Sequence, residues 1–214
     1  MKVVSIAKFR SNPDIVLQIV ATLKEGGIAC LPSPSGYRLM ADLQSDRPVM
    51  ALLQAKRRVK NAPALVLLPD PAGVDQVAKE VSADARRLMD RFWPGPLTLL
   101  VAPGDALHPG VRRAVARATG WMGVRLADDP DTAAVVSAFG APVLVSSANL
   151  SNRTGASSVA QVKKNFGRVV ALLVDAGDVA GRVTSTLVDV TGDAVKVVRE
   201  GAVDERDIMA ALVG

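Results

Sequence analysis

The sequence predicts an α/β fold, in which short buried strands alternate with helices along one sheet. Apolar, β-branched runs such as residues 64–68 and 143–146 are separated by segments with the apolar spacing of helices. That alternation is typical of helix-covered sheets rather than of sandwiches or bundles. A chain of 214 residues has the length of one globular unit. We therefore predict a single domain over residues 1–214.

Helix starts are marked by a polar capping residue and a proline. Asn12 and Pro13 open one helix, Asp46 and Pro48 a second, and Asp129 with Pro130 a later one. The predicted helices cover residues 13–25, 46–58, 74–81, 83–92, 109–118 and 130–139, and a last one ends at Phe166. The predicted strands cover residues 28–31, 64–68, 97–101, 122–126 and 143–146, with three more near Ala171, Ser185 and Ala194. Residues 151–158 are rich in Ser, Gly and Asn and are expected to form a loop.

Charge and cysteine content narrow the class of protein. A net charge of +5 and a pI near 9.7 favour an anionic partner such as a nucleotide, phosphate or nucleic acid, although an effect on solubility explains them equally well. Cys30 is the only cysteine, so the chain can form no internal disulfide. The N-terminus lacks a signal-peptide pattern, and the apolar runs are far shorter than the roughly 20 residues that cross a bilayer. We expect a cytoplasmic protein.

Two polar motifs stand where ligands often bind. Lys56-x-Arg58 combines a point charge with a planar guanidinium, a pair suited to a polyphosphate, but the same residues at a helix end are commonly solvated and offset the helix dipole. Ser147-x-Asn149 follows the strand 143–146, and open sheets bind ligands outside strand ends. A tight turn capped by the asparagine is the competing interpretation.

Arginines inside predicted strands are the more informative cations. Arg125 follows Met122-Gly123-Val124, where a charged side chain is costly unless it meets an anion. Arg199 repeats this pattern in a later strand, although Glu200 beside it offers an ordinary partner.

Several classes of site are absent from the sequence. It contains no Walker motif, no Gly-x-Gly-x-x-Gly after a strand, no Asp-Phe-Gly and no Gly-x-Ser-x-Gly. One cysteine and one histidine cannot build a zinc centre, and His108 is expected to be a loop residue rather than a catalytic base. No metal site of the protein's own is predicted.

Six short motifs occur in a fixed order along the chain. They are Lys56-x-Arg58, Trp93-Pro-Gly-Pro-Leu-Thr98, Gly123-Val-Arg125-Leu, Ser147-x-Asn149-Leu-Ser151, Ser185-Thr-Leu-Val-Asp189 and Val198-Arg-Glu-Gly201. In order and approximate spacing they resemble the YrdC-like family. Each motif is weak alone, but six in register, from about Ile15 to Gly201, make a specific match.

The resemblance implies a YrdC/RibB-like fold, a twisted mixed sheet with flanking helices around a basic concavity. The best understood members are L-threonylcarbamoyladenylate synthases. They combine ATP, bicarbonate and L-threonine into threonylcarbamoyl-AMP and pyrophosphate, and the product feeds the threonylcarbamoyladenosine modification of tRNA. For this chain the resemblance implies a nucleotidyltransferase with ATP as substrate and Mg²⁺ as its companion.

The site residues carry over by position. The resemblance implies ATP contacts from Lys56, Arg58, Asn149, Ser157 and Arg199, and threonine contacts from Ser35, Arg125, Ser147 and Ser185. Lys56 and Arg58 would be the catalytic pair, because they would offset charge on the phosphates and the departing pyrophosphate. Arg125 would pair with the threonine carboxylate through two hydrogen bonds.

The chain departs from the family pattern on the threonine side. It reads Pro32-Ser33-Pro34-Ser35-Gly36-Tyr37-Arg38, which lacks the usual carboxylate and has serines in place of two threonines. Ala62 and Thr184 also replace residues that are common in the family. Ser35-Gly36-Tyr37 is closer to the YciO branch. We expect the nucleotide half of the site to be retained and the threonine half to be altered.

Two functions therefore stay open. The first is the synthase, or a close relative that uses ATP, bicarbonate and another small amine in place of L-threonine, and it is favoured by the intact nucleotide residues. The alternative is a YciO-like member with altered or absent synthase activity that binds a nucleotide, tRNA or another RNA, and it is favoured by Pro34, Arg38 and Ala62. Few aromatic residues are available for base stacking, which weakens sequence-specific RNA binding but not phosphate-driven binding. A carbamoyl-transfer role is a third, weaker possibility.

Overall fold

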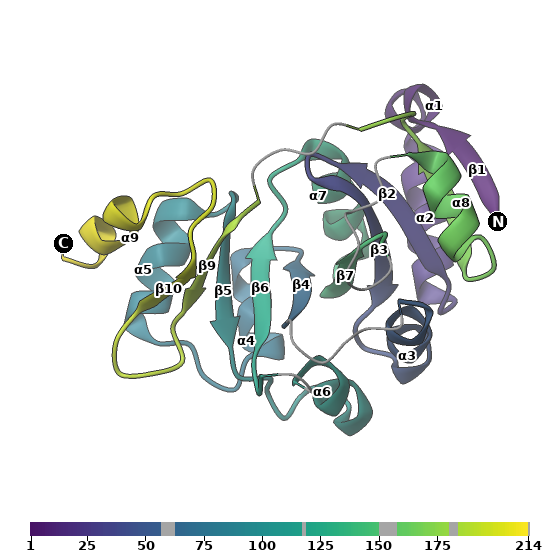
Figure 1. The fold of residues 1–214 in the computed structure, drawn as a ribbon. Coiled ribbons are helices and arrows are strands. Elements are labelled where there is room, and N and C mark those ends of the chain that lie inside the picture. The colour runs from purple at the N-terminus through teal and green to yellow at the C-terminus, as the bar shows by residue number, and fades with distance from the viewer. Residues whose placement is uncertain (57–62, 117–118, 150–157, 180–183, 214) are drawn as a thin grey trace.

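The computed structural model describes residues 1–56, 63–116, 119–149, 158–179 and 184–213 (Figure 1). The strands are β1 (Lys2–Ser5), β2 (Ile28–Ser33), β3 (Gly36–Asp42), β4 (Ala64–Leu68), β5 (Leu97–Val101), β6 (Met122–Leu126), β7 (Val143–Ser147), β8 (Val170–Asp175), β9 (Thr186–Asp189) and β10 (Lys196–Arg199). The helices are α1 (Ile6–Ser11), α2 (Pro13–Lys24), α3 (Asp46–Ala55), α4 (Val74–Val77), α5 (Ala83–Phe92), α6 (Pro109–Ala116), α7 (Pro130–Phe139), α8 (Val159–Phe166) and α9 (Glu205–Leu212), and η1 (Pro71–Gly73) is a 3-10 turn.

The ten strands of these described segments form one mixed sheet. Their order is β1-β8-β2-β3-β7-β4-β6-β5-β9-β10. β4 runs parallel to β6, whereas β7 runs antiparallel to both of its neighbours, β3 and β4. β1 and β10 are the two edge strands, so the chain termini lie at opposite ends of the sheet (Figure 1). The predicted α/β class, a twisted mixed sheet with flanking helices, is confirmed.

Helices cover both faces of the sheet. On one face α1, α2 and α7 contribute apolar side chains such as Ile19 and Val135. On the other face α3, α4, α5, α6 and α8 contribute residues such as Leu88 and Phe166. A strand covered on both faces is buried at successive residues, and β6 is accordingly buried at all five positions, Arg125 included. No helix of the described segments combines the length and the apolarity that crossing a bilayer requires.

Two of the three predicted capping residues act as expected. The third does not: Ser45, rather than Asp46, is the N-cap of α3, it forms no side-chain capping hydrogen bond, and Asp46 is the first residue of the helix. The side chain of Asn12 accepts the N–H of Asp14 at 3.0 Å, and Pro13 is the first residue of α2. Asp129 caps α7 by accepting the N–H of Thr132 at 2.8 Å. Gly26 ends α2 with φ +76, a left-handed conformation that glycine adopts without strain.

Other boundaries differ from the prediction. The helix expected over 74–81 ends at Val77, because Ala78 is extended and bridges to Pro103. The last strand begins at Lys196 rather than near Ala194. β1, α1, β3 and α9 were not predicted. The helix expected over 46–58 ends at Ala55 with Lys56 as its C-cap, and residues 57–58 lie outside the described segments.

Thr186 ties the segment after β10 to the sheet. Its buried hydroxyl donates to the Val203 carbonyl at 2.6 Å and accepts the N–H groups of Gly201 and Val203 at 2.9 and 3.0 Å. In Thr186→Val a methyl group would leave these backbone groups unpaired, so we expect the free energy of unfolding to fall by about 2 to 4 kcal/mol. Urea denaturation measures this. Thr184→Val, the same change on an exposed neighbour, should alter it by less than about 0.5 kcal/mol. Equal losses of unfolding free energy in the two variants would show that the Thr186 hydroxyl does not stabilise this segment.

Candidate functional site

A buried lysine organises the carboxyl end of β7. Lys56 is only 6% exposed, and its ammonium donates to Ser146 Oγ at 2.7 Å, to the Ser147 carbonyl oxygen at 2.6 Å and to Asn149 Oδ1 at 3.2 Å. The Ser147 hydroxyl bonds the same Asn149 oxygen. Hydrogen bonds from a charged donor are stronger than neutral ones. Lys56 therefore fixes the polar groups just past the strand.

The β2–β3 hairpin brings a second group to this place. Ser33 pairs with Gly36 across a two-residue turn, its hydroxyl donates to the Gly36 carbonyl at 2.6 Å, and Gly36 has φ +111, which favours glycine. Further along β3, Arg38 is the strand partner of Ser147, and its Nη2 donates to Ser35 Oγ at 2.9 Å. The hairpin thus places Ser35 and Arg38 beside the end of β7.

Arg125 enters the site from β6. Its side chain is 3% exposed, and its Nη2 donates to Asp128 Oδ1 at 3.0 Å. Asp129 follows and uses Oδ1 to cap α7 through Thr132. Among the described residues, Arg125 Nε and Asp129 Oδ2 are buried without a hydrogen-bond partner. Unpaired buried polar atoms are costly, so these two are candidates for contact with a ligand.

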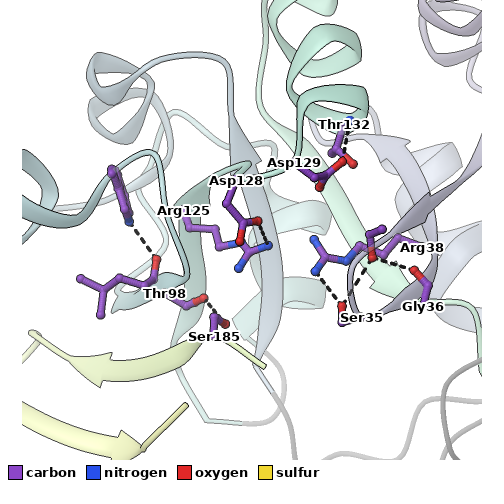
Figure 2. Close-up of polar contacts among 12 residues, drawn as sticks. Ser35, Gly36, Arg38, Thr98, Arg125, Asp128, Asp129, Thr132 and Ser185 are labelled. Carbon is purple, nitrogen blue, oxygen red and sulfur yellow. Dashed lines mark hydrogen bonds and ion pairs between the residues drawn. The ribbon is translucent and has the colours of Figure 1, made fainter. Parts of the chain in front are cut away.

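Arg38 and Arg125 lie close enough to affect each other's charge. Figure 2 shows their guanidinium groups pointing toward each other, with Asp128 and Asp129 nearby. Burial, and after it the charge of Arg125, lower the pKa of Arg38 to about 10, against the opposing effect of Asp129 and Asp128. Burial also lowers the pKa of Arg125, while Asp128 raises it. Both guanidiniums are cations held largely out of water, an arrangement that an anion would stabilise.

A further polar group comes from β5, from Ser185 just before β9, and from β10. Thr98 Oγ1 and Ser185 Oγ are 2.9 Å apart, and Arg199 Nη2 donates to the Ser185 carbonyl at 2.9 Å. Gly123 of β6 leaves room for this contact, since a Cβ there would lie 2.8 Å from Thr98 Cγ2. Thr98 and Ser185 lie on the Arg125 side of the site (Figure 2).

The sequence model of the Sua5/YciO/YrdC family, described as telomere recombination, matches residues 21–201. The chain belongs to this family. It is 28% identical over 203 residues to a threonylcarbamoyl-AMP synthase from Bacillus subtilis, in a match that covers 94% of this chain and 58% of that protein. The chain thus spans little more than half the length of this curated relative.

Solved structures from both branches of the Sua5/YciO/YrdC family share the fold. P. abyssi Sua5 complexed with L-threonine matches with a TM-score of 0.82 at 23% identity, over 94% of this chain and 58% of that one. E. coli YciO matches with a TM-score of 0.77 at 22% identity, over 90% of this chain and 92% of that one. At these identities the likeness establishes the fold and leaves the choice of branch open.

Most of the residues implied by the family resemblance fall into two groups, one on each side of the site. Lys56, Ser147 and Asn149 bond to one another, and Ser35 joins them through Arg38, the strand neighbour of Ser147. On the other side lie Arg125, Ser185 and Arg199. Arg58 and Ser157 lie outside the described residues. The division of these residues between ATP and an amino acid stays a prediction.

The structure changes two interpretations of charged residues. Lys56 is not a solvated helix end, because it is buried against β7. Arg199 is not a buried strand cation, because it lies exposed on the edge strand β10 and reaches the Ser185 carbonyl. Glu200 instead accepts the N–H of Glu205. The burial of Arg125 is confirmed.

Asp128 and Asp129 are not among the site residues that the sequence predicts, and Arg38 is recognisable there only as a departure from the family pattern. The available signal was the pair of acidic residues three and four positions after Arg125, at the carboxyl end of a buried strand. A buried guanidinium needs a carboxylate, and residues just past a strand end are placed to supply it.

Proposed function

We propose that this member of the Sua5/YciO/YrdC family is a threonylcarbamoyl-AMP synthase-like nucleotidyltransferase. The amine of L-threonine takes up carbon dioxide from bicarbonate as a carbamate, with loss of water. A carbamate oxygen then attacks the α-phosphorus of ATP and displaces pyrophosphate, which leaves threonylcarbamoyl-AMP. The name of the Bacillus subtilis relative supports this reaction, and the threonine complex of P. abyssi Sua5 supports the class of substrate. The product would serve the threonylcarbamoyladenosine modification of tRNA.

One observation carries the proposal: the buried Lys56 holds Ser147 and Asn149 at the end of β7, beside the facing guanidiniums of Arg38 and Arg125. This supports phosphate binding at the Lys56 end, where a fixed ammonium would offset the charge that develops on the phosphates. The proposed ATP contacts are Lys56, Arg58, Asn149, Ser157 and Arg199.

The amino acid would occupy the neighbouring part of the site. Its proposed contacts are Ser35, Arg125, Ser147 and Ser185, with Arg125 on the carboxylate. Magnesium would accompany ATP on its phosphates, the usual way in which this ion enters such sites. Catalysis would then consist mainly of positioning and electrostatic stabilisation, as in phosphoryl transfer generally.

A direct assay tests the proposed reaction. The protein is mixed with ATP, Mg²⁺, bicarbonate and L-threonine, pyrophosphate release is followed, and the adenylate is identified by mass spectrometry. We expect pyrophosphate and adenylate in equal amounts, and neither when bicarbonate is removed. ATP binding without any adenylate would contradict the synthase. It would favour the YciO-like alternative, and titration with labelled tRNA in low salt would then test RNA binding.

A further inference from the structure

Two arginines from separate strands share one buried place in the site. Arg38 projects from β3 and Arg125 from β6, and β7 and β4 lie between these strands in the sheet. Their guanidinium groups nevertheless point toward each other (Figure 2). The charge on Arg125 is, after burial, the main cause that lowers the pKa of Arg38. Like charges at such a place favour a ligand with negative charge.

Of the two arginines, only Arg125 has a direct ion pair with a nearby carboxylate of the described residues. Asp128 bonds Arg125 directly at 3.0 Å. Asp129 uses one oxygen to cap α7. Arg38 donates to the neutral hydroxyl of Ser35, and no carboxylate of the described residues forms an ion pair with it. Arg38 is therefore the cation that lacks a direct counter-ion within the part of the chain that the structure describes.

Three buried polar atoms at this place have no hydrogen-bond partner among the described residues: Arg38 Nη1, Arg125 Nε and Asp129 Oδ2. They are one donor on each guanidinium and one carboxylate oxygen. An amino acid with two carboxylates matches this set, because each guanidinium would bind one carboxylate and the amine would donate to Asp129. An amino acid with a neutral side chain would leave Arg38 without an anion.

We propose that the site accepts an acidic L-amino acid, aspartate or glutamate, in preference to threonine. Arg125 binds the α-carboxylate, and Arg38 binds the side-chain carboxylate. The inference rests on one part of the proposed function, the transfer of AMP from ATP to a carbamate in this site, and it replaces L-threonine by an acidic amino acid as the preferred substrate. The chemistry at the amine is unchanged: nitrogen takes up carbon dioxide from bicarbonate with loss of water, and the carbamate oxygen displaces pyrophosphate from ATP.

Calorimetric titration of the full chain separates charge from shape. L-aspartate and L-asparagine have nearly the same shape, so the ratio of their dissociation constants reports the side-chain charge. We expect aspartate or glutamate to bind roughly 10- to 100-fold more tightly than asparagine or threonine, the range for a charge-assisted hydrogen bond. In Arg38→Met the aspartate-to-asparagine ratio should fall to about 1. Arg47→Met, on an exposed arginine, should leave the ratio unchanged.

Asparagine or threonine that binds the wild-type protein as tightly as both acidic amino acids would overturn the proposal, and this comparison needs no variant. An unchanged ratio in folded Arg38→Met would overturn it too. A non-hydrolysable ATP analogue is also titrated into the wild-type protein and into each variant. If Arg38→Met weakens binding of the analogue and leaves aspartate binding unchanged, Arg38 binds the nucleotide and the proposal is wrong.

The same measurements distinguish a failure of this inference from a failure of the proposed function. Binding is measured without bicarbonate or turnover. Aspartate that binds selectively but yields no pyrophosphate with ATP and bicarbonate supports the inference and contradicts the synthase. Threonine that yields the adenylate while neither acidic amino acid binds overturns the inference and supports the synthase.

Discussion

Arg125→Gln is expected to lower kcat/KM for the amino-acid substrate by roughly 100-fold or more, while the protein stays folded. Glutamine keeps one donor group, the amide NH2, but removes the positive charge and the two donor nitrogens that bind both oxygens of a carboxylate. A lost charge-assisted contact costs about 1.5 to 3 kcal/mol, and the loss of a bidentate pair lies at the upper end of that range or beyond it. Pyrophosphate release at varied amino-acid concentration gives the ratio.

The fold should survive because the partner of Arg125 reaches solvent. The side chain of Asp128 is 28% exposed, so water can hydrate this carboxylate once the guanidinium is gone. Arg113→Gln makes the same chemical change on an exposed residue of α6 and should keep kcat/KM within about twofold. A folded Arg125→Gln protein with wild-type kcat/KM would show that another group binds the carboxylate.

The sequence predicts best those parts of the fold that local chemistry decides. Asn12 and Asp129 each bond a backbone N–H two or three residues away, so a short window of sequence contains the whole interaction. The missed strand β3 has a different origin. Its pairing joins Arg38 to Ser147 across 109 positions, and a charged side chain inside an otherwise apolar run hides the strand from a periodicity test.

In the candidate site, too, the sequence predicts local features and misses those that depend on how distant strands pair. Lys56, Ser147 and Asn149 are recognisable as two short motifs, but only the sheet shows that one residue bonds the other two. The guanidiniums of Arg38 and Arg125 face each other because of the order and the bending of four strands of the sheet. A local sequence pattern carries no information about that arrangement. Arg199 and Arg125 looked equivalent in sequence. They differ because β10 is an edge strand and β6 is covered on both faces.

Lys56→Met is expected to reduce kcat by roughly 100- to 1000-fold, the range found when one preorganised donor is removed from a site of developing charge. Methionine keeps the apolar stem and all but the last atom of the lysine side chain, so the packing of the C-cap of α3 is retained. Two effects combine. The phosphates lose a cation, and Ser146, Ser147 and Asn149 lose the donor that holds them in place.

The two effects of Lys56 can be separated by a second variant. Lys56→Arg keeps the charge but replaces a compact ammonium by a planar group that cannot donate to the same oxygens with the same geometry. If charge on the phosphates dominates, Lys56→Arg recovers most of kcat. If positioning of the β7 end dominates, the kcat of Lys56→Arg stays close to that of Lys56→Met, because the serines and the asparagine are still displaced. Lys79→Met, on an exposed lysine, is the matched control and should retain wild-type kcat. Full kcat in folded Lys56→Met would mean that Lys56 stabilises the strand end without taking part in the reaction.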